Sequence, residues 1–275
     1  MPGRTLRHLD EATVGLRGEV RRWAPWAVPH LKRVRRAVLG PDPNVRVRNE
    51  HFVPSEGTDL EPYLEAGDRL AVHHLIRYHW AIAVLSDDPP ATLVDVATGA
   101  GYGAAMLAAA LPTTEVIGLD LDADAVAGAA REHRAPNLSF RTGDLMQFET
   151  VGLTDIDCVV TFDTIEHIPH RELMLMGLVE HLSPAGRVLL STPVHQAGVW
   201  LDPPWEHHRI EYSPDTLLDL LHRYFGRVDR PDNGTLPHRE VFDVLAGSGI
   251  RYVLGMNPLV CSQPIRVPHD ARATP

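Results

Sequence analysis

Three glycines at alternate positions, Gly99, Gly101 and Gly103, interrupt the chain where an apolar run meets an alanine-rich stretch, "LVDVATGAGYGAAMLAAA". Glycine lets backbone amides approach a ligand closely, and a turn of this kind between a strand and a helix is typical of phosphate and nucleoside sites. The dinucleotide pattern G-x-G-x-x-G/A is also satisfied, with Ala104 as its last member. Asp120 follows about 20 residues later, where a ribose-binding acid is expected. The turn alone does not separate NAD from other adenosine ligands.

Two further acids accompany this turn. Asp95 lies inside the apolar run, four residues before Gly99, and a carboxylate in such a strand needs a partner. The amine of a ligand or the amides of the turn could supply it. In "RTGDLM", Asp144 ends a short strand, where it can accept a hydrogen bond from an adenine amino group or cap the following turn.

A third group lies in "VVTFDTIEHIPH", where Asp163, Glu166 and His167 follow an apolar strand. Open α/β sheets bind their ligands at the carboxyl ends of their strands. We therefore expect these side chains at the same edge of a sheet as the glycine turn.

Strands that alternate with helices must position these residues. We expect strands at 91–97, 114–121, 138–144, 155–163, 186–193 and within 251–262. We expect helices in the first 40 residues and at 66–86, 102–111, 123–134, 171–182, 213–225 and 239–249, with Ser213 as an N-cap. This alternation predicts a parallel sheet with right-handed crossovers.

The pieces "VDVATGAGYG", "VIGLDLD", "RTGDL", "TFDTIEHI" and "LSPAGRVLLSTP", in this order and spacing, resemble the class I S-adenosylmethionine-dependent methyltransferases. The resemblance is strongest over residues 91–194. With "RNEHFVPSEG" and "HHRIEYSPDTL" it extends over about 48–224 and is similar to a bacterial subgroup of small-molecule and sugar O-methyltransferases. It implies a Rossmann-like seven-stranded α/β sheet with an N-terminal helical extension and cofactor cover at 1–90. The core then spans 91–275, with an acceptor-site segment around 195–247.

The resemblance also implies roles for individual residues toward S-adenosylmethionine. Gly99 and Gly101 let the backbone pass close to the methionine part, and Asp95 holds the turn or the amino group. Asp120 takes both ribose hydroxyls, a pairing that its two oxygens suit. The remaining expectations concern the adenine (Leu121, Asp144 and Leu145), the ammonium (the Phe162 carbonyl) and the carboxylate (Arg77 and Tyr78).

Methyl transfer from this cofactor requires an aligned acceptor and exclusion of water. A hydroxyl acceptor must also lose its proton, and a histidine that titrates near neutrality suits that task. We expect His167 as the first-choice base, with His208 in "HHRIEY" and His195 in "STPVHQ" behind it.

Asp163, Glu166 and His167 form D-x-x-E-H, which resembles the E-x-x-E-H element of ubiquinone-pathway and small-RNA methyltransferases. Those enzymes use it, with a downstream histidine, to hold magnesium, and His208 or the adjacent His207 would be that histidine here. Asp163 is one methylene shorter than glutamate, and "EHIP" also occurs in methyltransferases without a metal. The sequence therefore favours no metal and leaves magnesium as an alternative.

Charge is unevenly distributed. The net charge is −10, yet residues 1–50 hold 11 of the 26 Lys and Arg and only 5 of the 36 Asp and Glu. The acidic remainder disfavours nucleic acid as a partner and favours a small-molecule acceptor. The basic amphipathic stretch at 31–39 is a candidate surface for a homo-oligomer or another partner.

The cellular location is inferred from apolar segments that the sequence does not contain. It contains no run of about 18 apolar residues and no signal-peptide core at its N-terminus, so we expect a cytoplasmic protein without stable membrane insertion. Its two cysteines, Cys158 and Cys261, have no metal-binding spacing.

Three rival functions remain. An NAD(P)-dependent oxidoreductase could use the same glycine turn, but a Tyr-x-x-x-Lys pair is absent because Lys32 is the only lysine. A noncatalytic adenosyl-binding partner subunit would bind the cofactor without turnover. An RNA 2′-O-methyltransferase is disfavoured by the acidic main body.

Overall fold

The computed structural model describes residues 51–194, 198–201, 208–230 and 258–266. The helix expected in the first 40 residues, the helix expected at 239–249 and the base candidate His195 lie outside the described residues.

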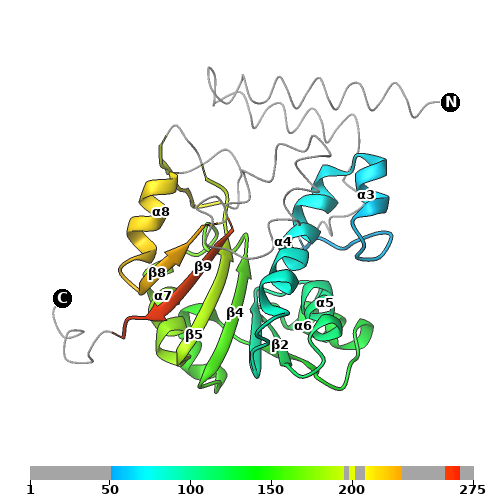
Figure 1. Cartoon of the computed structure of the whole chain (residues 1–275), viewed down its shortest axis with the longest axis horizontal. Coiled ribbons are helices and arrows are strands. Elements are labelled where there is room, and N and C mark those ends of the chain that lie inside the picture. The colour runs from blue at the N-terminus through cyan, green and yellow to red at the C-terminus, as the bar shows by residue number, and fades with distance from the viewer. Residues whose placement is uncertain (1–50, 195–197, 202–207, 231–257, 267–275) are drawn as a thin grey trace.

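Seven strands form one twisted sheet (Figure 1). They are β1 (Thr92–Val96), β2 (Glu115–Asp120), β3 (Leu138–Thr142), β4 (Ile156–Phe162), β5 (Leu182–Ser191), β8 (Phe225–Asp229) and β9 (Leu259–Pro264). The spatial order is β3-β2-β1-β4-β5-β9-β8, with the first five strands parallel and β9 antiparallel to both of its neighbours. Because the chain leaves β1 toward β2 and returns to β4 on its other side, the topological switch point lies between β1 and β4. A second sheet pairs β6 (Trp200–Leu201) with β7 (Ile210–Glu211).

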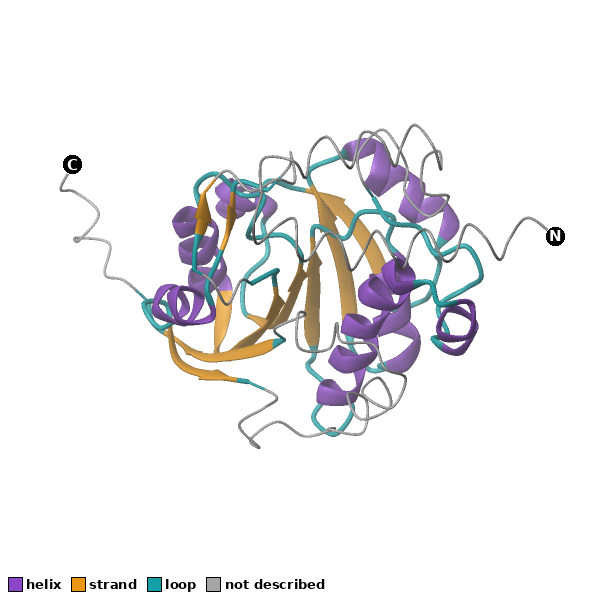
Figure 2. Cartoon of the chain, turned by 90° about the horizontal axis from the view of Figure 1, so that it is seen from above, coloured by secondary structure: helices purple, strands orange, loops and turns teal. Residues whose placement is uncertain are grey.

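Helices lie on both sides of the large sheet (Figure 2). They are α3 (Glu61–Ala66), α4 (Arg69–Leu85), α5 (Tyr102–Ala110), α6 (Ala123–Glu132), α7 (Arg171–His181) and α8 (Pro214–Leu221), with a short 3₁₀ segment η2 (Leu145–Val151). Helix α8 begins after Ser213, whose hydroxyl accepts a hydrogen bond from the Thr216 amide, so the predicted N-cap is confirmed.

The central strands are buried on both faces. Leu93 and Val94 are adjacent in β1 and point to opposite faces, yet each is fully buried. Leu93 belongs to a core formed with α4 and α5, and Val94 to a core formed with η2, α7 and α8. This explains the nearly continuous apolar runs of the parallel strands.

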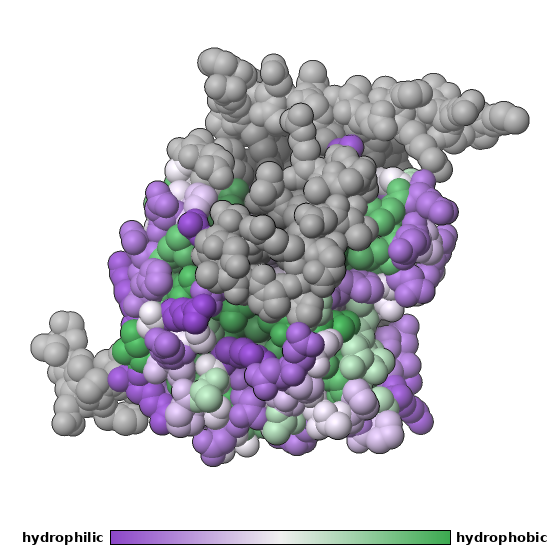
Figure 3. All heavy atoms as spheres, viewed as in Figure 1, coloured by the Kyte–Doolittle hydropathy of each residue, from purple (hydrophilic) through white to green (hydrophobic). Residues whose placement is uncertain are grey.

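The surface of the described residues is mixed in character. Hydrophilic residues are spread over the visible face, with smaller hydrophobic areas between them (Figure 3). None of the described helices is long and apolar enough to cross a membrane.

The predicted α/β fold is confirmed. Each strand expected between 91 and 193 occurs, the last strand is β9, and the helix expected at 66–86 is α4. Strand β8 and the β6–β7 pair were not assigned from the sequence. The five residues of β8, "FGRVD", carry no clear alternation, because the apolar Phe225 and Val228 are three positions apart and so lie on opposite faces of the strand.

The third glycine of the turn has a packing role. A Cβ atom at Gly103 would lie 2.0 Å from the Tyr78 ring, which α4 presses against the first turn of α5. The phenol continues past Gly103 and donates a hydrogen bond to Asp95 in β1 at 3.2 Å. Gly103 is therefore needed so that α4 can reach the strand beneath the turn.

We expect Gly103→Ala to lower the free energy of unfolding by roughly 1–3 kcal/mol, because the added methyl group must displace the Tyr78 ring. Gly128→Ala in α6 is the matched control, since its Cβ would meet nothing closer than an Arg131 nitrogen at 4.0 Å. Alanine is about 0.5–1 kcal/mol better than glycine in a helix, so the control should be neutral or stabilised. Denaturant unfolding measures both, and equal effects would contradict the packing argument.

Candidate active site

The carboxyl ends of the parallel strands bring most of the predicted site residues to one edge of the sheet. The glycine turn follows β1, Asp120 ends β2, Asp144 follows β3, and Phe162 ends β4. Ligands of open α/β sheets bind at this edge beside the switch point.

The glycine turn adopts a backbone that other residues avoid. Gly99 and Gly101 have φ angles of +55° and +79°. A Cβ atom at Gly101 would also lie 2.6 Å from Ala129 and 2.8 Å from the Phe140 ring, so α6 and β3 leave no space for a side chain. Glycine is thus favoured by conformation at both positions, and at Gly101 it is also required by packing.

Asp120 holds the turn from the neighbouring strand. Its Oδ2 accepts a hydrogen bond from the Gly99 amide at 2.8 Å, and its Oδ1 accepts one from the Asp122 amide at 2.9 Å. A carboxylate oxygen has two lone pairs, so each oxygen can accept one more hydrogen bond. Next to it, the residue Leu121 is 67% exposed.

The residues expected at the adenine and ammonium ends have local partners. Asp144 caps η2 by accepting a hydrogen bond from the Met146 amide at 2.9 Å, and Leu145 beside it is buried. The Phe162 carbonyl accepts a hydrogen bond from the Thr164 hydroxyl at 3.1 Å. Their predicted contacts with the cofactor stay predictions.

Asp95 is a buried carboxyl group with two hydroxyl partners. Thr98 Oγ1 donates to Oδ2 at 2.6 Å, and the Tyr78 phenol donates to Oδ1. Burial raises the pKa of Asp95 to about 7, against these two hydrogen bonds and with a smaller contribution from the charge of Asp120. The predicted role in holding the turn fits these contacts, since Thr98 belongs to the turn.

Arg77 from α4 makes a buried ion pair with Asp163. The guanidinium donates to Asp163 Oδ1 at 2.7 Å and to Ser191 Oγ at 2.7 Å, and it also donates to the His73 carbonyl. Burial alone would raise the pKa of Asp163, but Arg77 and the hydrogen bond with His73 hold that pKa well below its usual range. These partners make Arg77 the link between α4 and the ends of β4 and β5. The predicted contacts of Arg77 and Tyr78 with a cofactor carboxylate stay predictions, and both side chains are already engaged within the protein.

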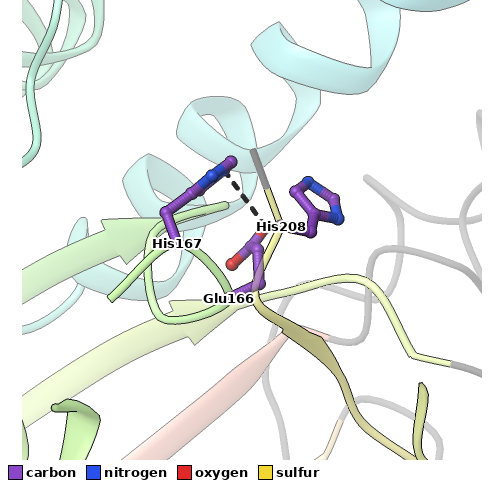
Figure 4. Close-up of side chains that lie close together, drawn as sticks. All are labelled: Glu166, His167 and His208. Atoms are coloured by element: carbon purple, nitrogen blue, oxygen red, sulfur yellow. Dashed lines mark ion pairs between the residues drawn. The ribbon is translucent and has the colours of Figure 1, made fainter. Parts of the chain in front are cut away.

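Glu166, His167 and His208 converge from two segments far apart in the sequence (Figure 4). One oxygen or nitrogen atom of each lies within 4.8 Å of the other two, and the two imidazole rings meet edge to face at 4.7 Å between centroids. His167 Nε2 lies 4.0 Å from Glu166 Oε1. Asp163, the fourth member of the magnesium alternative, is not part of this cluster. We refer to Glu166, His167 and His208 as the Glu-His-His cluster.

Glu166 is fully buried. Its Oε2 accepts a hydrogen bond from Thr192 Oγ1 at 2.8 Å, whereas Oε1 has no hydrogen-bond partner among the described residues. Burial, reinforced by the negative charge of Asp163, raises the pKa of Glu166 well above its usual range.

His208 is oriented by an acid that the sequence did not single out. Its Nδ1 lies 2.6 Å from Oε1 of Glu211, which is buried in β7. The signal was a glutamate between two apolar residues in "RIEY", three positions after His208. A buried charged residue in such a strand indicates a specific partner.

This architecture defines a class of protein. An open and mostly parallel sheet, with a glycine turn after β1 and an acid at the end of β2, is the nucleoside-binding type of α/β fold.

Comparisons with known proteins narrow this class. Residues 93–186 match the family model of a methyltransferase domain. A trans-aconitate 2-methyltransferase of Deinococcus radiodurans is 30% identical over 113 residues, which are 41% of this chain and 42% of that protein. A probable S-adenosylmethionine-dependent methyltransferase of Mycolicibacterium smegmatis is 31% identical over 132 residues, covering 47% of this chain and 44% of that protein. The match thus spans less than half of the length of both relatives.

One solved structure extends the likeness in fold. The CurJ carbon methyltransferase is similar with a TM-score of 0.54 at 15% identity, covering 91% of this chain and 70% of that chain. This likeness in fold agrees with the match of residues 93–186 to the methyltransferase-domain model.

The buried Asp95 predicts a dependence of stability on pH. Its carboxyl group binds a proton in the folded protein up to a pH of about 7, but in the unfolded chain only up to its usual 3.8. The free energy of unfolding should therefore fall as the pH rises between these values, by up to about 1.4 kcal/mol per pH unit. Asp95→Asn cannot titrate, so its stability relative to the wild type should increase from pH 5 to pH 7.

Urea unfolding at several pH values measures this effect. Asp124→Asn, which removes an exposed carboxylate in α6, should keep the wild-type pH slope. If the free energy of unfolding of Asp95→Asn changes with pH as that of the wild type does, Asp95 is ionised in the folded protein and the prediction is wrong.

Proposed function

We propose that this chain transfers a methyl group from S-adenosylmethionine to a hydroxyl oxygen of a small molecule, such as a sugar or a natural-product intermediate. The observation that carries the proposal is the Glu-His-His cluster at the edge of the sheet that also holds the glycine turn. The cluster thus places side chains that can accept a proton at the same edge of the sheet as the glycine turn and Asp120.

The described residues fit the cofactor. Gly99 and Gly101 place no side chain at the turn, and Asp120 keeps one lone pair on each oxygen for ribose hydroxyls. The exposed Leu121 side chain offers an apolar surface for adenine. When bound, S-adenosylmethionine supplies a methyl group on a sulfonium, whose sulfur keeps the electron pair of the broken S–CH3 bond.

The protein must then deal with the acceptor. A hydroxyl oxygen that gains a methyl group must give up its proton, which the cluster can take directly through an imidazole. Alternatively, a cation held by the cluster would lower the pKa of the hydroxyl, so that the hydroxyl loses its proton more readily. We assign this step to His167 and His208, while the third base candidate, His195, lies outside the described residues.

The composition supports a small-molecule acceptor. The acidic main body after residue 50 repels nucleic acid. We also propose a cytoplasmic location and a homo-oligomer through the basic N-terminal stretch, both of which rest on the sequence alone.

Titration calorimetry with S-adenosylhomocysteine, and with NADH as control, tests the cofactor. We expect binding of S-adenosylhomocysteine only. Asp120→Ala should weaken it by roughly 1–3 kcal/mol, because a buried ribose loses its charged acceptor. Asp124→Ala, four residues away and exposed, should bind normally. Binding of NADH alone would reject the methyltransferase proposal and support an NAD(P)-dependent oxidoreductase.

His167→Gln tests the acceptor side. It should leave S-adenosylhomocysteine affinity unchanged and slow methyl transfer by roughly 10²–10⁴-fold, the range of general acid–base catalysis. Methyl-labelled cofactor with a panel of sugar, phenol and amine acceptors measures the rate. His170→Gln, an exposed histidine in the same loop, is the control. Turnover of amines alone, or an unchanged rate in His167→Gln, would reject O-methylation by this cluster.

A further inference from the structure

We propose that Glu166, His167 and His208 bind a divalent transition-metal ion, with Glu211 orienting His208 from behind. The donor set is two imidazoles and one carboxylate, which converge from two segments on one point (Figure 4). Three protein ligands of this kind leave further coordination positions open for water or a substrate oxygen.

The first argument is the state of Glu166. Its side chain is fully buried, and its Oε1 atom lies in the cluster without a hydrogen-bond partner among the described residues. A buried carboxyl oxygen needs a hydrogen-bond partner, or a cation when the group is ionised. Its other oxygen is already fixed by the Thr192 hydroxyl, so the side chain cannot turn away from the cluster.

The second argument is the pairing of His208 with Glu211. In the 2.6 Å contact between His208 Nδ1 and Glu211 Oε1, the carboxylate oxygen accepts and the ring nitrogen donates. Metal-binding histidines are commonly held by a carboxylate in this manner, which fixes the tautomer and raises the basicity of the other nitrogen.

The third argument is the backbone that joins the two segments. The Arg209 amide donates to the Glu166 carbonyl at 2.8 Å, and Arg209 Nε donates to the His167 carbonyl at 3.2 Å. His208 is thereby held beside Glu166 and His167. His167 has 34% of its side chain exposed, so the cluster is open to solvent on the side of this residue.

The ligand types select the metal. Two imidazole nitrogens favour zinc, copper, iron or nickel, whereas magnesium prefers oxygen ligands and water. Asp163 would have added such an oxygen, but its carboxylate is bound by Arg77. We therefore expect a first-row transition metal in place of the magnesium considered from the sequence.

The catalytic use of this ion rests on the proposed methyl transfer. An acceptor hydroxyl in an open coordination position would lose its proton more readily, since a bound cation lowers its pKa. Metal binding itself does not depend on that proposal.

The test is titration of tag-free, chelator-treated full-length protein with Co²⁺, followed by visible absorption and calorimetry. We expect one saturable Co²⁺ site per chain that Zn²⁺ displaces and millimolar Mg²⁺ does not. Glu166→Gln and His208→Asn should lose this site. Glu211→Gln should weaken it by roughly 10- to 100-fold, as for other carboxylates behind a metal-binding histidine.

The variant His170→Asn is the matched control and should bind Co²⁺ as the wild type does. The other histidines, among 16 in the chain, are present in every variant and set a common background. If Glu166→Gln does not fold, His167→Asn replaces it, because its side chain is partly exposed. Wild-type binding in the cluster variants, no saturable site, or displacement by Mg²⁺ would overturn the proposal. S-adenosylhomocysteine binding, measured without metal, separates this failure from failure of the proposed function.

Discussion

The buried ion pair between Arg77 and Asp163 joins the helical part before β1 to the edge of the sheet where the candidate site lies. Arg77 is almost fully buried and reaches from α4 to the ends of β4 and β5. Removal of one partner from such a pair commonly costs about 3–5 kcal/mol, because the other charge stays buried. Tyr78, the next residue, fixes the same helix to Asp95 and the first turn of α5. The position of α4 therefore governs both halves of the site.

This pair also decides the chemistry of the cluster. Asp163 has a φ angle of +50°, a left-handed conformation that aspartate tolerates better than most residues. Because Arg77 binds its carboxylate, Asp163 does not join the cluster of Glu166, His167 and His208. Glu166, three residues later, is left with one bound oxygen and with imidazoles as neighbours. The element that resembled an oxygen-rich magnesium site thus becomes a nitrogen-rich one.

The sequence predicted those features of the structure that depend on residues close together in the chain. The glycine turn, Asp120 at the end of a strand and the Ser213 cap each depend on neighbours within a few residues, and the structure has them where they were expected. The ion pair joins residues 86 positions apart, and no periodicity reports such a pairing. The packing role of Gly103 was missed for the same reason, since Tyr78 reaches it from another helix. Glu211 was visible only as a charged residue in an apolar strand.

The chemistry of the Glu-His-His cluster depends on one short stretch of chain, residues 208–212. His208, Arg209 and Glu211 all lie within residues 208–212, which pair with β6 through β7 and form a bridge with Val194 after β5. Arg209 holds the loop of Glu166 and His167 through two backbone carbonyls. A displacement of this stretch would therefore remove one ligand, its orienting acid and the brace of the other two ligands together. The proton-accepting side of the site is complete only when this stretch lies against β4 and β5, whereas the glycine turn and Asp120 are formed without it.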